Sequence, residues 1–188
     1  MSTEKFVKKA RVISAVRDYK KRRIRRKEKK VDFTVSPSDS DDKILIRVIT
    51  EPESKSGYIG VDTVREMDDV LEKRDYDKGI LIGKRFTEAA KREMENENIE
   101  AISERITPHF KVERLYSAID SCIQKLCKAK CGHIPTEESD CKGYIDGCYS
   151  CDVRLINDNA SFHLERGWTH LLERDLVKLL AIEKTLNS

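Results

Sequence analysis

The sequence lacks the features that mark membrane and secreted proteins. Its apolar runs are far shorter than the roughly 20 residues that span a bilayer, and its first residues are basic where a signal peptide has an apolar core. Mean hydropathy is −0.61, and charged residues make up 38% of the 188. We therefore expect an intracellular, cytoplasmic protein, whose six cysteines are metal ligands or buried thiols and not a disulfide framework.

The net charge of +3 conceals a strong asymmetry. Residues 1–30 contain fourteen Lys or Arg against three acidic residues, whereas the remaining residues carry 23 basic and 31 acidic side chains. A basic segment of this density suits polyphosphate, because neutralised phosphates release counterions, or an acidic protein partner. A solvated helix face is disfavoured, since like charges at i and i+4 repel. The candidate nucleic-acid contacts are Lys20, Lys21, Arg22, Arg23, Arg25, Arg26, Lys27, Lys29 and Lys30.

The order of predicted elements indicates an α/β fold, with a mixed central sheet flanked by helices. Alternation and β-branched content predict strands, and apolar residues at three- and four-residue steps predict helices. Thr63 with Glu66 spells a capping box, and Thr87 is a second helix cap. The predicted elements are a helix over 3–20, hairpin strands 31–35 and 43–50, a helix 63–73, a strand 78–84, a helix from 87, a strand 99–103, and helices after Pro108 and from Trp168.

Composition divides the chain into three predicted parts. Residues 1–30 would form a basic helical arm, and residues 31–126 the α/β domain. Residues 127–188 would form a Cys-rich metal-binding segment followed by a C-terminal helix.

Several stretches carry a family resemblance over roughly residues 5–105. "VDFTV", "ILIRVIT", "KGILIGKRFTEAAKREM" and "IEAIS" occur in an order that resembles the restriction-endonuclease-like fold. The chain is similar to Mrr-type endonucleases and archaeal Holliday-junction resolvases. It also resembles two non-catalytic members of that fold, the jaw domain of the fifth subunit of eukaryotic RNA polymerase and the archaeal TBP-interacting protein.

The resemblance implies where a nuclease site would lie. In active members the first hairpin strand supplies an Asp and the second supplies an acid-x-Lys, which together hold Mg²⁺ beside the scissile phosphate. Asp32 occupies the first position, but the second pair falls at or near Arg47 and Ile49, which bind no metal. The strand is therefore expected to have lost its metal ligands.

A second acid-x-Lys follows the strand, at Glu53-Ser54-Lys55. With Asp32 it offers an alternative catalytic set of Asp32, Glu53 and Lys55. Pro52 and the "SKSG" sequence place this pair in a loop, and a loop carboxylate holds the octahedral geometry of Mg²⁺ poorly.

The cysteine segment predicts a metal site. Cys127 with Cys131 and Cys148 with Cys151 have spacings that let two thiolates face one ion, and Cys141 and His133 are alternate ligands. A structural zinc ion is the first choice, and a 4Fe–4S cluster, unligated thiols or a disulfide are alternatives. Cys122 lies on the apolar face of the preceding helix and is expected in the core.

Three functions are compatible with these features. The first is a non-catalytic nuclease-like module that binds DNA or a transcription component such as TBP or RNA polymerase, with a structural zinc site. The second is a Mg²⁺-dependent endonuclease of Mrr or resolvase type. The third is an Fe–S protein of nucleic-acid processing. A homodimer is also possible by analogy with the fold.

Overall fold

The computed structural model describes residues 3–52, 57–103, 109–131 and 152–186. The chain forms two compact units, residues 1–109 and residues 110–188. Each unit buries apolar side chains of its own.

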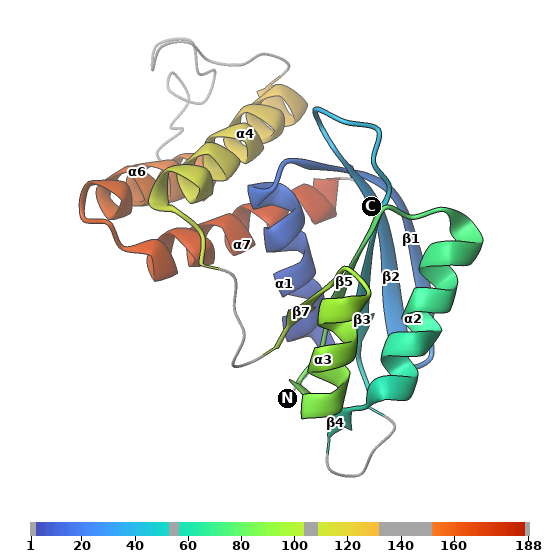
Figure 1. Ribbon diagram of the computed structural model, residues 1–188. Coiled ribbons are helices and arrows are strands. Elements are labelled where there is room, and N and C mark those ends of the chain that lie inside the picture. Colours follow the sequence, from blue (N-terminus) through green and yellow to red (C-terminus); the bar gives the residue numbers. More distant parts are fainter. Residues whose placement is uncertain (1–2, 53–56, 104–108, 132–151, 187–188) are drawn as a thin grey trace. The chain divides into compact units, whose positions relative to one another are not determined.

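A five-stranded mixed sheet is the framework of the first unit (Figure 1). Its strand order is β1-β2-β3-β5-β7, with antiparallel pairing from β1 to β3 and parallel pairing from β3 to β7. Strands β4 and β6 form a separate two-stranded parallel pair. The predicted α/β fold is therefore confirmed. The elements are α1 Thr3–Val16, β1 Tyr19–Lys27, β2 Lys30–Pro37, β3 Ile44–Ile49, β4 Tyr58–Ile59, α2 Val61–Arg74, β5 Lys78–Ile82, β6 Arg85–Phe86, α3 Glu88–Asn96 and β7 Ile99–Ile102.

Helices cover both faces of this sheet. All six residues of β3 are buried, as expected for a strand with helices on either side. On one face Leu45 and Leu81 pack with Met67 of α2 and Met94 of α3. On the other lies α1, and just beyond its last residue Arg17 donates to both carboxylate oxygens of Glu100 on β7, at 2.7 and 2.6 Å.

The two predicted helix caps have different outcomes. Thr87 caps α3, since its hydroxyl accepts from the Ala90 amide at 3.1 Å, as predicted. The capping box of Thr63 and Glu66 is wrong. Helix α2 begins at Val61 after Gly60, whose extended backbone forms the N-cap without a side-chain bond. Thr63 consequently lies inside the first turn.

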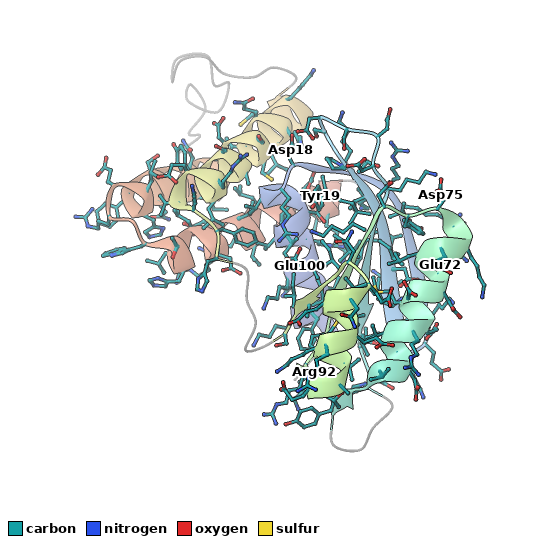
Figure 2. The ribbon with its side chains drawn as sticks, viewed as in Figure 1. Asp18, Tyr19, Glu72, Asp75, Arg92 and Glu100 are labelled. Carbon is teal, nitrogen blue, oxygen red and sulfur yellow. The ribbon has the colours of Figure 1, made fainter. Side chains whose placement is uncertain are left out.

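Residues 19–27 differ from the expected basic helical arm. Helix α1 ends at Val16, Asp18 adopts a positive φ of 51°, and the chain turns into strand β1 (Figure 2). The Asp18 carbonyl accepts from the amide and the hydroxyl of Ser38, which ties the start of β1 to the end of β2. Because successive side chains of a strand point to opposite faces, a strand relieves the i, i+4 repulsion that this run would suffer as a helix.

The second unit is helical in its described part. Helix α4 extends through residue 126, where the boundary of the α/β domain was expected. The C-terminal helix is present as α7, and α6 before it was not predicted. No helix among the described residues is long and apolar enough to cross a membrane. The elements are α4 Val112–Cys131, α6 Asp152–Glu165 and α7 Thr169–Leu186.

A Schellman motif joins α6 to α7. The Trp168 amide donates to the His163 carbonyl at 3.0 Å, the Gly167 amide donates to the Leu164 carbonyl at 2.9 Å, and Gly167 has a φ of 65°. The Trp168 ring lies 6.1 Å from the His163 ring, the hydrophobic contact typical of this motif. His163 Nδ1 lies 2.7 Å from Asp175 Oδ2 of α7, a buried contact that fixes the connection.

Candidate functional site

Asp32 and Arg47 form a buried ion pair on the face of the sheet that carries α2 and α3. They are direct cross-strand neighbours on β2 and β3. Arg47 Nε donates to Asp32 Oδ1 at 2.8 Å, and Arg47 Nη2 donates to Oδ2 at 3.0 Å. Arg47 is 1% exposed and Asp32 is 8% exposed. The Arg47 guanidinium thus donates a hydrogen bond to each carboxylate oxygen of Asp32.

Glu66 of α2 adds a second carboxylate to this pair. Its Oε1 lies 3.6 Å from Arg47 Nη1 and accepts a hydrogen bond from Lys30 Nζ. The Lys30 hydrogen bond is the main cause that lowers the pKa of Glu66, against the opposing effect of burial, and the charges of Arg47 and Lys27 lower it further. Lys30, Glu66, Arg47 and Asp32 therefore form a chain of alternating charge.

This arrangement does not fit the Mg²⁺ ion of an active nuclease. A divalent ion needs free carboxylate oxygens, and those of Asp32 already accept from Arg47. Two residues further along β3, where the family pattern has Lys, stands the buried hydrocarbon side chain of Ile49. Within the described ranges, no cluster of three His, Cys, Asp or Glu side chains could hold a metal ion.

The alternative catalytic set is only partly described. Asp32 has the partners given above, while Glu53 and Lys55 lie outside the described residues. Their assignment as metal ligand and catalytic lysine stays a prediction.

The predicted nucleic-acid contacts gather on an edge strand. Seven of the nine lie in β1, Lys29 lies in the turn that follows, and Lys30 begins β2. Arg25 and Lys30 are half-buried and the others are exposed. Charged edge strands also prevent unwanted pairing with other strands, and a bulge at Arg22 contributes to that protection.

The cysteine prediction falls mostly outside the described residues. Helix α4 continues through Cys131, so Cys127 and Cys131 are four residues apart in a helix where a short loop was expected. Cys148 and Cys151, with the alternates Cys141 and His133, are not among the residues the structure describes. Cys122 is buried as predicted, and burial raises the pKa of its thiol to about 11.

Comparison with known proteins decides the family. The family described as "Mrr_cat: Restriction endonuclease" matches residues 1–105, which is more than half of the chain. The chain belongs to this Mrr_cat restriction-endonuclease family. The match spans the whole sheet, α1 to α3, the Asp32–Arg47 pair and the basic strand β1.

Other comparisons add little to the family match. No curated protein matches the chain. Among solved structures, the chain is similar to one titled "Structure of EndoMS in apo form", with 17% sequence identity and a TM-score of 0.36. The similarity covers 54% of this chain and 47% of that one, so the chain spans about half the length of that structure.

Sequence analysis missed one member of the site. Glu66 was assigned to a helix cap, whereas its carboxylate contacts Lys30 and Arg47. The available signal was its place one residue before the buried Met67 and two after the buried Val64, which puts Glu66 beside the apolar face of α2.

Proposed function

We propose that this chain is a DNA-binding module of the restriction-endonuclease family that does not cut DNA at Asp32. One observation carries the proposal: the bidentate Arg47 guanidinium takes both oxygens that a nuclease would offer to Mg²⁺. Family membership supports DNA as the partner. The exposed cations of β1 supply the positive charge that such binding needs.

The DNA contact is tested by salt dependence. Binding of the full chain to a fluorescent duplex should weaken linearly in log Kd against log salt, with a slope of about 0.9 per phosphate contact. In Arg23→Gln/Arg26→Gln that slope should fall by about 0.9 for each of the two side chains that contacts a phosphate. The matched control is Lys91→Gln/Arg92→Gln on α3 (Figure 2), which should leave the slope unchanged. Equal slopes in wild type and the β1 variant would remove β1 from the interface.

A transcription protein is the proposed alternative partner for the body of the chain. Residues after position 30 carry eight more acidic than basic side chains, which suits a basic surface such as the DNA-binding face of TBP, or a site on RNA polymerase. Competition separates the two: a protein bound through the acidic body should not be displaced by duplex DNA.

The second candidate function is a Mg²⁺-dependent DNA endonuclease that uses Asp32, Glu53 and Lys55. The family match supports it more directly than it supports a non-catalytic role, because the family is one of restriction endonucleases. The assay is cleavage of linear and branched DNA with Mg²⁺ or Mn²⁺. Cleavage that disappears in both Asp32→Asn and Lys55→Ala would establish this candidate and overturn the first.

We further propose a structural zinc ion held by Cys127, Cys131, Cys148 and Cys151. Its support is the spacing of the two pairs and the polar composition of the segment, which leaves a metal as its main source of folding energy. Elemental analysis should find zinc in colourless protein. Brown protein that contains iron would indicate the 4Fe–4S alternative.

A further inference from the structure

The alternation of strand β1 sorts its cations onto the two faces of the sheet. Directly opposite residues of antiparallel strands point to the same face. Arg25 is opposite Asp32, which is opposite Arg47, so Arg25 shares the face of the buried ion pair. By the same register, Arg23 and Lys27 lie on this face too, since they are opposite Thr34 and Lys30.

The opposite face of β1 holds fewer cations. Arg26 is opposite Val31 and Lys21 is opposite Val35, with Ile24 between them. Val31 and Val35 are buried side chains on the face away from Asp32. The bulge at Arg22 shifts the register between the two halves of the strand.

Four cations of this face follow the bulge, and we call them the basic shelf: Arg23, Arg25, Lys27 and Lys30. Lys20, opposite Ser36, lies on the same face before the bulge. Within the described part of the chain, Arg23, Arg25 and Lys27 have no ion-pair partner. Lys30 is bonded to Glu66, and Asp32 is neutralised by Arg47. The shelf therefore carries net positive charge, and the nearby Asp32 carboxylate is already paired with Arg47.

We infer that duplex DNA lies on the basic shelf, on the Asp32–Arg47 face of β1, and not on the opposite face. This inference rests on the proposed DNA binding and specifies its geometry. Same-face residues of a strand are about 6.6 Å apart, so the line from Arg23 to Lys27 is about 13 Å long. That length spans about four phosphates at 3.4 Å of axial rise per nucleotide.

The composition of β1 favours a duplex over a single strand. Single-stranded DNA is held largely by stacking of bases on aromatic rings, and the only aromatic residue of β1 is Tyr19, at its first position. A shelf of guanidinium and ammonium groups contacts backbone phosphates instead. Such contacts predict little preference for base sequence.

Glu66 places one negative charge at the rim of the shelf. Its side chain is 51% exposed and shares Lys30 with any phosphate that approaches. Removal of this carboxylate should therefore strengthen DNA binding, whereas removal of shelf cations weakens it. The two effects have opposite signs and come from neighbouring side chains.

The test compares two double variants that remove the same charge from the same strand. Arg23→Gln/Lys27→Gln alters the shelf, and Lys21→Gln/Arg26→Gln alters the opposite face. For a 20-bp duplex, the shelf variant should lower the salt slope by about 1.8, which makes the loss of affinity between 50 and 200 mM salt about tenfold smaller. The opposite-face variant should keep the wild-type slope.

Other outcomes overturn the inference in distinguishable ways. Equal reductions in both variants mean diffuse attraction to β1, which leaves the proposed function standing without the shelf. No reduction in either variant removes β1 from the interface and, with it, the proposed mode of DNA binding. Far-UV circular dichroism of both variants checks that the sheet is intact.

Two further measurements complete the test. Glu66→Gln should bind the duplex more tightly than wild type, and weaker or unchanged binding contradicts a phosphate at Lys30. A single strand of the same length should bind more weakly than the duplex at every salt concentration. Tighter binding of the single strand would overturn the choice of ligand.

Discussion

The substitution Arg47→Met tests whether the buried Asp32 carboxylate depends on the Arg47 guanidinium as its ion-pair partner. Met has a similar length but no charge, so Arg47→Met leaves the Asp32 carboxylate 8% exposed and without the donors that hold it at 2.8 and 3.0 Å. Removal of one partner from a buried ion pair costs about 3–5 kcal/mol, because the remaining charge is uncompensated. We expect a loss of stability in that range.

A double-mutant cycle isolates the pair itself. Asp32→Leu should also destabilise the protein, but Asp32→Leu/Arg47→Met should cost less than the sum of the two single changes, since it buries no unpaired charge. Hydrogen exchange of the β2 and β3 amides in urea reports the first unit separately from residues 110–188. The reasoning is refuted if Arg47→Met costs under about 1 kcal/mol or if the two changes are additive.

Three other predictions concern single side chains. Because the pKa of Glu66 is lowered in the folded chain, its carboxylate stabilises the fold at pH values above the ordinary pKa of 4.5, and this contribution is lost as pH falls through the folded-state pKa. Glu66→Gln should therefore make the free energy of urea unfolding less dependent on acid pH, and an unchanged pH profile would contradict this. With a thiol pKa of about 11, Cys122 should react with iodoacetamide at pH 8 far more slowly in the native chain than in urea; equal rates in peptide mapping would show that it is accessible. Gly83→Ala should cost about 1–3 kcal/mol, because a Cβ there would overlap Ile59 Cδ1; unchanged urea unfolding would show that Ile59 can move aside.

The hairpin of β2 and β3 could be predicted from sequence because its apolar residues follow the patterns typical of buried strands. Continuous β-branched and aliphatic residues over 43–50 predicted a strand, and in the structure all six residues of β3 are buried. Placing Asp32 on the first strand then located Arg47 and Ile49 where the family has its acid and lysine. In the structure Asp32 and Arg47 are direct cross-strand neighbours.

Strand β1 could not be predicted because hydrophobic periodicity does not mark it. Its single aliphatic residue, Ile24, gives neither a helical nor a strand period, and its pairing with β2 is a tertiary interaction. The contact of Glu66 with Arg47 is tertiary in the same way, since it depends on how α2 packs on the sheet. Charge alone identified the basic residues, but the face on which each one lies required the register.

Divalent-ion binding at Asp32 can be measured directly. Mn²⁺ titration of the full chain with bound duplex, followed by electron paramagnetic resonance, should give the same number of bound ions in wild type and in Asp32→Asn. The side chain of Asn has the same shape and keeps one acceptor for Arg47, and any metal held by the cysteines is common to both proteins. A Mn²⁺ site present in wild type and lost in Asp32→Asn would show that Asp32 binds a metal ion, which contradicts the account and favours the endonuclease candidate.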